Sequence, residues 1–457
     1  MLKTSLFIFR RDLRLADNTG LIAALEQSAQ VIPCFIFDPL QVSDNNKYKS
    51  ANALQFMLES LDDLAEQLAA RGGKLHLFYG EPADVLGMLI KEEKVDAVFV
   101  NHDYTPYSIK RDKTLASVCK KNDVAFNAYH DALLNKPEAA LKHDGTPYSV
   151  FTPYFKNALT IPVAASRLNK HANYKTLTHE RTAAKDILPD RNENIFVQGG
   201  RSQGKKILAR LDAYKKYEHE RDFPALEATT GLSAHLKFGT CSVREIYEAV
   251  IQKLGRAHPL IRQLYWRDFF THVAFNNQHV FGHAFNQQYE YIQWDNDVHK
   301  FNRWCTGSTG FPIVDAGMRQ LNATGWMHNR VRMIVASFLV KDLLIDWRWG
   351  EQYFATKLVD YDPAVNNGNW QWAASTGCDA QPYFRIFNPW LQQKKFDPDC
   401  KYIKHWIPEL AHVLPTHIHE WVKISALSNS PYPRPIVDHS LVSKQAICLF
   451  KGLAKHA

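Results

Sequence analysis

Short apolar runs and longer segments of helical periodicity alternate over the first 131 residues. The apolar runs are rich in β-branched and aromatic residues, which favours strands. Five such runs occur, at residues 6–9, 31–37, 75–79, 97–100 and 125–128. Residues 51–71 carry apolar side chains at helical spacing, and Gly72 follows as a stop signal. Strands that alternate with helices predict an α/β domain with a doubly wound parallel sheet over residues 1–131.

The first strand is followed by the charged segment RRDLRLADN, residues 10–18, and not by G-x-G-x-x-G. The glycine-rich fingerprint of dinucleotide-binding folds is therefore absent after this strand. We expect the charges to gather at the carboxyl end of the strand. A solvated loop with salt bridges and a functional role both remain open for this segment.

Periodicity fades over residues 132–200, where Pro, Asn, Lys and Thr accumulate. We expect a long interdomain linker there, ordered where an apolar segment such as YSVFTPYF (148–155) docks. Over residues 201–457 the pattern is helical, which predicts a second, all-helical domain. All eleven tryptophans lie at or after Trp266, so the two parts also differ in composition.

Two segments of the helical part predict a polar pocket. A helix expected over residues 329–345 presents Asn329, Arg332 and Met333 on one face. The segment 360–389, DYDPAVNNGNWQWAASTGCDAQPYFRIFNP, holds carboxylates, adjacent asparagines and two tryptophans one residue apart. Such groups are costly to bury unless each meets a specific partner. The second segment therefore predicts a pocket for a large heteroaromatic ligand.

The overall composition is that of a globular protein. The 457 residues are 46% hydrophobic and 22% charged, with a net charge of +8 that is compatible with a polyanionic partner. Seven scattered cysteines without C-x-x-C spacing are typical of reduced thiols in a cytoplasmic protein, without a disulfide framework or a metal site. No run of 18 apolar residues and no signal-peptide pattern occurs, so a membrane association is not expected.

Several long motifs resemble the photolyase/cryptochrome flavoproteins, most closely the class I cyclobutane pyrimidine dimer (CPD) photolyases. Besides the opening segment, they are RDFPALEATTGLS (221–233), LYWRDFF (264–270), GFPIVDAGMRQLNATGWMHNRVRMI (310–334) and YPRPIVDH (432–439). The motifs follow one another in the family's order across the whole chain. The resemblance implies an antenna-type N-terminal domain and an FAD-binding catalytic domain. It also implies repair of UV-damaged DNA by reduced FAD (FADH⁻) under light.

The resemblance implies an FAD site with two groups of residues. The segment that matches the family's phosphate-binding residues consists of Tyr217, Thr229, Thr230, Gly231, Leu232 and Ser233. The positions that match the surroundings of the flavin are Gln263, Trp266, Arg267, Phe270, Asn329, Arg332, Asp360, Asp362 and Asn366. Among these, Asn366 matches the amide that faces flavin N5.

The resemblance also implies how the damaged DNA and the electrons are handled. A dimer inside duplex DNA must be flipped out to reach the flavin, and Trp266 and Trp372 match the aromatic walls that receive it. Gln263, Asn329 and Met333 match further residues of the lesion site. The positions that match contacts to DNA phosphates are Arg221, Arg330, Arg385 and Lys395. The positions that match an electron path from the surface to the flavin are Trp370, Trp347 and Trp294.

Two departures from the class I pattern affect the expected substrate and chromophores. Gln263 stands where class I members carry a glutamate and (6-4) photolyases a glutamine, while Asn329 and Met333 replace the histidine pair of (6-4) enzymes. We therefore expect CPD repair by a monomer, with (6-4) repair or blue-light signalling as alternatives. NHDYTPYS (101–108) lacks the glutamate of folate-binding members, so the antenna could be methenyltetrahydrofolate, an 8-hydroxy-deazaflavin, or absent.

Overall fold

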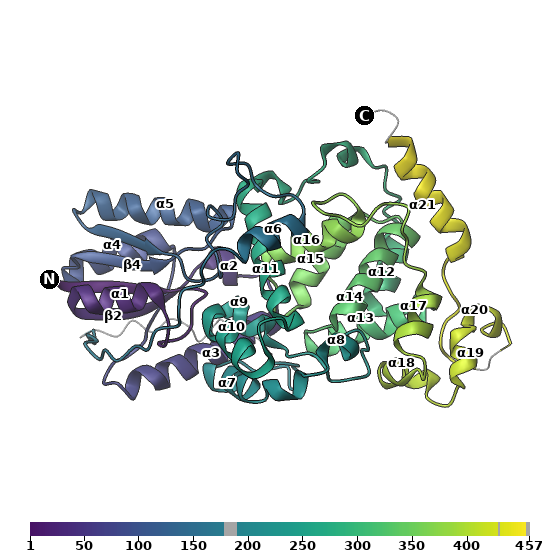
Figure 1. The fold of residues 1–457 in the computed structure, drawn as a ribbon, viewed down its shortest axis with the longest axis horizontal. Coiled ribbons are helices and arrows are strands. Elements are labelled where there is room, and N and C mark those ends of the chain that lie inside the picture. Colours follow the sequence, from purple (N-terminus) through teal and green to yellow (C-terminus); the bar gives the residue numbers. More distant parts are fainter. Residues whose placement is uncertain (178–189, 428–429, 454–457) are drawn as a thin grey trace.

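Five parallel strands form one sheet in the N-terminal part of the protein, in the order β3-β2-β1-β4-β5 (Figure 1). The computed structural model describes residues 1–177, 190–427 and 430–453. The strands are β1 (Leu2–Phe9), β2 (Ser28–Phe37), β3 (His76–Tyr79), β4 (Ala97–Asn101) and β5 (Ala125–Tyr129). The predicted parallel sheet is therefore confirmed, and each of the five apolar runs lies in one strand.

Alternate residues along the strands face two separate cores, because successive side chains in a strand point to opposite faces. Phe7 and Phe9 pack with α1 and α3 on one face, whereas Ile8 and Val98 pack with α4 and α5 on the other. The helices of this part are α1 (Thr19–Gln27), α2 (Pro39–Val42), α3 (Ala51–Ala69), α4 (Pro82–Glu93) and α5 (Pro106–Lys121). The doubly wound arrangement follows from this two-sided cover.

The charged segment after β1 is buried at the junction between the sheet and the helical part. Arg14 is 2% exposed and pairs with Asp131 at 2.6 Å. Arg244 of α10 (Val243–Leu254) reaches the same carboxylate at 2.8 Å and Asp17 at 2.9 Å. Two guanidinium groups and two carboxylates thus neutralise one another, as buried charges require. The interpretation of residues 10–18 as a solvated loop is wrong.

The linker packs on both parts of the protein. It contains α6 (Phe151–Ala158), which lies beside α11 (Pro259–Asn276) of the helical part in Figure 1. Phe151 is only 1% exposed, so the predicted docking of residues 148–155 is confirmed. Further along, Val31 of β2 donates to Asn173 O at 2.9 Å and accepts from Lys175 N at 2.8 Å. The domain limits at residues 131 and 200 stay predictions.

The part after residue 200 is helical, as predicted. Up to residue 291 its elements are α7 (Arg201–Ala209), η2 (Leu211–Tyr214), α8 (Tyr217–Glu220), α9 (Leu232–Phe238), α10, α11 (Pro259–Asn276), η3 (Gln278–Val280) and η4 (Gln287–Tyr291). The next are α12 (Val298–Thr306), α13 (Pro312–Thr324), α14 (Asn329–Ser337), η5 (Phe338–Asp342), α15 (Trp347–Lys357) and α16 (Pro363–Ala374). The last are α17 (Pro389–Phe396), α18 (Lys401–Trp406), η6 (Pro408–Leu410), α19 (Pro415–His419), α20 (Trp421–Ile424) and α21 (His439–Leu453).

The helix expected over residues 329–345 ends earlier than its pattern predicted. α14 stops at Ser337 and continues as the π-helical turn η5. The wider turn directs Asp342 to His439 at the start of α21, where the two side chains are hydrogen-bonded. Phe338, Leu339 and Val340 are all buried in this turn, so the apolar pattern alone gave no sign of the change in helix type.

Gly239 lies where the sheet domain meets the helical part, and it allows the two backbones to approach closely. Gly239 ends α9 with a left-handed φ of +63°, and a Cβ there would lie 2.2 Å from the backbone O of Arg11.

We expect Gly239→Ala to lower the free energy of unfolding by roughly 2–4 kcal/mol, from backbone strain and overpacking together. Gly72→Ala is the matched control, because Gly72 has a φ of +71° and no atom within 4 Å of the added Cβ. It should cost about 1 kcal/mol. Equal losses in urea unfolding would contradict this account.

Candidate functional site

Asp360 connects three helices at the centre of the helical part. Its carboxylate accepts a hydrogen bond from Ser233 Oγ at 2.6 Å, in the first turn of α9. The same carboxylate pairs with Arg332 Nη2 of α14 at 3.0 Å. Asp360 itself lies just before α16, so these two contacts bring together three residues that are far apart in the sequence.

The predicted phosphate-binding segment forms the turn into α9. Gly231 has a left-handed φ of +66°, which a residue without a Cβ adopts without strain. Thr230 Oγ1 accepts from the backbone N of Leu232 at 3.3 Å, and Thr229 is half-buried beside it in the chain. Tyr217 on α8 is buried, with its ring 5.9 Å from that of His258 at the start of α11.

Helices α11 and α16 approach closely where Phe270 meets Gly368. A Cβ on Gly368 would lie 2.1 Å from the Phe270 ring, so only glycine permits this spacing. Asn366, half a turn earlier, is 9% exposed and donates from Nδ2 to Glu351 O at 3.1 Å. The two predicted aromatic walls, Trp266 on α11 and Trp372 on α16, each lie one helical turn from this contact.

The other predicted lesion residues surround these walls on two helices. Trp266 is half-buried and packs 5.5 Å from Phe270, while Gln263 is half-buried one turn earlier on α11. Asn329 is exposed at the start of α14 and lies 3.8 Å from Met333 Sδ. Amide, thioether and indole groups that remain partly accessible can contact a flat ligand and its polar edges.

Three of the four predicted phosphate-contacting cations are held by aromatic rings. Arg330 and Lys395 approach the ring of Phe396 at 4.5 and 5.1 Å, so this phenylalanine brings them together. Arg330 also pairs with an aspartate, Asp222, at 2.9 Å. Arg221 lies over the Tyr217 ring at 5.7 Å. The fourth cation, Arg385, is exposed in the loop between α16 and α17.

The three predicted electron-transfer tryptophans pack in or against one core. Trp370 and Trp347 are 2% and 1% exposed and belong to the large core of the helical part. Trp294 is half-buried and packs against this core, next to Phe450 of α21. The series therefore runs from buried to partly exposed positions, while the transfer role itself stays a prediction.

Arg267 and Asp362, two residues predicted to lie beside the flavin, make contacts at the junction between the two domains. Arg267 donates to Ala132 O at 2.6 Å and to Leu236 O at 3.2 Å. Asp362 caps α16 and pairs with Arg11 from the segment after β1. Burial opposes ionisation of Asp362, but Arg11, Lys237 and Arg267 together outweigh it and lower the pKa of this carboxyl to about 2.

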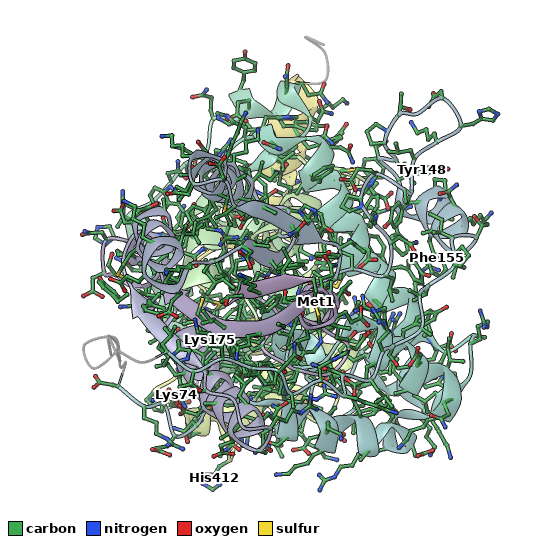
Figure 2. All side chains as sticks on the ribbon, turned by 90° about the vertical axis from the view of Figure 1, so that its left-hand side faces the viewer. Met1, Lys74, Tyr148, Phe155, Lys175 and His412 are labelled. Atoms are coloured by element: carbon green, nitrogen blue, oxygen red, sulfur yellow. The ribbon has the colours of Figure 1, made fainter. Side chains whose placement is uncertain are left out.

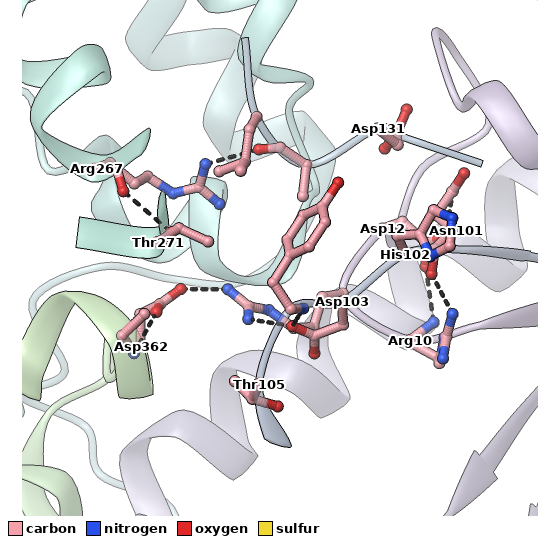
Figure 3. Close-up of a pocket in the computed structure, with 15 residues that line it drawn as sticks. Arg10, Asp12, Asn101, His102, Asp103, Thr105, Asp131, Arg267, Thr271 and Asp362 are labelled. Carbon is pink, nitrogen blue, oxygen red and sulfur yellow. Dashed lines mark hydrogen bonds and ion pairs between the residues drawn. The ribbon is translucent and has the colours of Figure 1, made fainter. Parts of the chain in front are cut away.

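A crevice lies at this junction, at the carboxyl ends of β1, β4 and β5. Figure 3 shows Arg267, Thr271 and Asp362 of the helical part on one side and Asp103, Asn101 and Asp12 of the sheet domain on the other. The sheet order reverses between β1 and β4, which is where open α/β sheets generally bind ligands.

Sequence reasoning missed Glu351, a buried acid on α15 behind Asn366. Its side chain is 5% exposed, and its backbone O receives the Asn366 amide. Burial raises the pKa of the Glu351 carboxyl from 4.5 to about 7, while Asn367 and Arg348 only partly oppose this. Glu351 lies one helical turn after Trp347 and one before Phe354–Ala355, so it falls on the apolar face of the helix. That position in the helical pattern could have identified it.

Comparison with known proteins assigns the chain to a family. Residues 5–170 match the model of the DNA photolyase domain, and residues 260–452 match the FAD binding domain of DNA photolyase. A deoxyribodipyrimidine photo-lyase of Alkalihalophilus pseudofirmus is 38% identical over 97% of this chain and 97% of its own length. The chain belongs to the DNA photolyase family.

Two solved photolyase structures share the whole fold. An archaeal photolyase from Sulfolobus tokodaii, described with two FAD molecules, has a TM-score of 0.89 at 44% identity, covering 98% of this chain and 100% of that one. A class III photolyase from Agrobacterium tumefaciens has a TM-score of 0.91 at 34% identity, covering 100% of this chain and 98% of that one. Both structures therefore match this chain along nearly its whole length.

The donor set in the helical part fits an FAD molecule. Thr229, Thr230 and Ser233 lie within two residues of the left-handed Gly231, and hydroxyl and backbone N–H groups at such a turn can bind a diphosphate. The buried amide of Asn366 and the Arg332–Asp360 pair supply polar contacts for a ring with polar edges. The match of residues 260–452 to the FAD binding domain of DNA photolyase confirms the predicted FAD-binding character of this domain.

The described ranges contain neither a membrane-spanning helix nor a metal cluster. Within residues 1–177, 190–427 and 430–453, no helix is both long and apolar enough to cross a membrane. In the same ranges, no three His, Cys, Asp or Glu side chains come together as a metal site requires. All seven cysteines are free thiols, and Cys448 is the exposed one.

The raised pKa of Glu351 predicts a pH-dependent effect on stability. An unfolded chain ionises this group near pH 4.5, whereas the folded protein holds the proton up to about pH 7. Its contribution to stability therefore falls as the pH rises from about 4.5 to 7 and then stays constant. Glu351→Gln removes the penalty, so we expect stabilisation on the order of 2 kcal/mol at pH 8 and little change at pH 5.

Urea unfolding at the two pH values measures this effect. Glu218→Gln, at an exposed position of α8, is the matched control and should behave alike at both pH values. A Glu351→Gln variant whose change in stability is the same at pH 5 and pH 8 would show that the carboxyl ionises normally.

Proposed function

We propose that this photolyase repairs cyclobutane pyrimidine dimers in DNA with light, and that FAD is its catalytic cofactor. The observation that carries the proposal is the full-length similarity to deoxyribodipyrimidine photo-lyases, at 38% identity over 97% of both chains for the A. pseudofirmus protein. The 35% identical Escherichia coli protein of the same name covers 99% of both chains. A match of this extent includes both domains and the linker between them.

The bound FAD, when reduced and excited by light, supplies the electron that splits the dimer. The chain binds and orients the reactants. Thr229, Thr230 and Ser233 would hold the diphosphate through hydroxyl and backbone donors. Asn366 would offer an amide to the flavin edge without adding charge, because its carboxamide is neutral at every working pH.

The lesion would enter between the two aromatic walls. A dimer stacks poorly in duplex DNA, so flipping it out costs less than flipping an intact pair. Trp266 and Trp372 would each stack on the flipped bases, at about 1–3 kcal/mol per base. Arg221, Arg330, Arg385 and Lys395 would contact phosphates around the pocket, and salt should therefore weaken DNA binding.

The finer assignments extend this proposal. We assign the chain to the class I CPD enzymes, since Asn329 and Met333 cannot supply the acid and base of (6-4) repair. Trp370, Trp347 and Trp294 would carry electrons inward when the flavin is photoreduced, which their graded burial supports. We also propose that the protein is a cytoplasmic monomer and that the linker begins after residue 131 and ends at residue 200.

A light-harvesting chromophore would occupy the N-terminal domain. The crevice at the carboxyl ends of β1 and β4 is the position that a doubly wound sheet offers to a ligand. Methenyltetrahydrofolate and an 8-hydroxy-deazaflavin are the expected candidates. The S. tokodaii photolyase, which contains two FAD molecules, adds a second flavin as a third.

Separate oligonucleotides with a CPD or a (6-4) product test the function. The purified protein, reduced and illuminated, should restore the CPD substrate and leave the (6-4) substrate unchanged. Incubation in the dark and the protein with oxidised flavin are the controls, and neither should repair. If the protein restored only the (6-4) oligonucleotide, its substrate would be the (6-4) product and not the CPD. Binding of damaged DNA without any repair would favour the signalling alternative.

Gln263 should limit the yield of repair. A neutral amide cannot donate a proton to the dimer radical as a carboxylic acid can, so we expect Gln263→Glu to repair more dimers per absorbed photon than the parent. A gain of about threefold or less is expected, because a single hydrogen-bonding group is exchanged. Gln263→Ala separates the loss of hydrogen bonding from the gain of an acid. A Glu variant no faster than the parent would contradict this reading.

A further inference from the structure

Phe151 of the linker stacks directly on Trp266. The two ring centroids lie 3.6 Å apart, and the ring planes differ by only 6°. Phe151 is 1% exposed, whereas Trp266 is half-buried. Phe151 therefore covers one face of the indole, and the part of Trp266 that solvent reaches lies elsewhere on the side chain.

The start of α6 is fastened to the loop that follows the second aromatic wall. The backbone N of Phe151 donates to Asp379 Oδ2 at 3.1 Å. One residue before Asp379, Cys378 donates from Sγ to Ser149 O at 2.7 Å. This loop follows Trp372 at the end of α16. Residues 149–151 thus connect the elements that carry both walls.

The stacked rings of Trp266, Phe151 and Phe155 form an aromatic column, and the exposed Arg262 packs against it. Arg262 lies 5.1 Å from the Phe151 ring and 5.6 Å from the Phe155 ring, next to Gln263 on α11. Figure 2 shows Tyr148 and Phe155, which bracket Phe151 in the chain, on the outer side of the molecule. Phe151 is the member of this column that touches Trp266.

We propose that the linker is part of the lesion pocket and that Phe151 is a positioning residue for lesion binding, acting through Trp266. The inference rests on the proposed function, in which Trp266 stacks on the flipped dimer. Aromatic stacking depends on the angle and offset of the rings. A partner that already fixes the indole plane removes rotational freedom that binding would otherwise have to restrict.

The proposal distinguishes lesion recognition from general DNA binding. Undamaged duplex is held through phosphates and does not need the indole plane. Loss of the Phe151 ring should therefore weaken binding to a CPD oligonucleotide while leaving binding to the undamaged oligonucleotide unchanged. A residue with a purely structural role would change both affinities together, or neither.

Phe151→Leu is the test variant, because it keeps an apolar side chain and removes the ring plane. We expect the ratio of CPD affinity to undamaged-DNA affinity to fall about fivefold to tenfold, with the FAD content unchanged. Phe151→Tyr keeps the ring and should restore the ratio. Phe155→Leu is the matched control on the same helix, since Phe155 stacks on Phe151 and meets Tyr265 edge-on. It should leave the ratio near that of the parent.

A double-mutant cycle with Trp266→Leu decides whether Phe151 acts through the indole. In that background, Phe151→Leu should have no further effect on the ratio. An additive effect, or an unchanged ratio in the single variant, would overturn the proposal. If the Leu variant does not fold with FAD, Phe151→Met fills the same space with a flexible chain and takes its place. A parent protein that shows no preference for the CPD oligonucleotide would refute the proposed function instead.

Discussion

The contact between Phe270 and Gly368 determines the geometry on which the rest of the site depends. A phenyl ring resting on a helix backbone fixes the distance between α11 and α16, and any side chain at position 368 would force the helices apart. The two helices carry Trp266, Asn366 and Trp372 within one turn of this contact. A pocket for a flat ligand needs walls at a fixed spacing, because stacking weakens steeply when the rings separate.

The junction with the sheet domain stabilises the same helices from the other side. Arg11 reaches from the segment after β1 to Asp362, the residue that caps α16, and Arg14 and Arg244 share Asp131. Breaking a buried pair of this kind leaves an uncompensated charge, which typically costs 3–5 kcal/mol. The position of α16 therefore depends on the sheet domain as well as on α11, so the two domains cannot shift independently without disturbing the site.

The sequence alone was sufficient for the sheet, the helical part and the family, because each depends on patterns within short segments. Alternating apolar runs identified the strands, and motifs such as LYWRDFF identified the FAD-binding part. What depended on contacts between distant residues was missed. The sequence of residues 10–18 was equally compatible with a solvated loop and with a functional role, since their partners Asp131 and Arg244 lie more than a hundred residues away. The stack of Phe151 on Trp266, two residues more than a hundred positions apart, was missed for the same reason.

The acidic side chains in the predicted flavin surroundings bear on the choice between glutamine and glutamate at position 263. Asp360 is paired with Arg332, Asp362 with Arg11, and burial keeps Glu351 protonated up to about pH 7. Each of these acidic groups is thus either paired with an arginine or kept neutral by burial. In the proposed lesion site, a glutamate at position 263 would bring a negative charge toward a bound DNA strand, whose phosphates would repel it unless it were protonated. Gln263 would keep the hydrogen-bonding capacity without that repulsion. Under the proposed function, exchanging glutamine for glutamate would therefore lower DNA affinity while making a proton donor available.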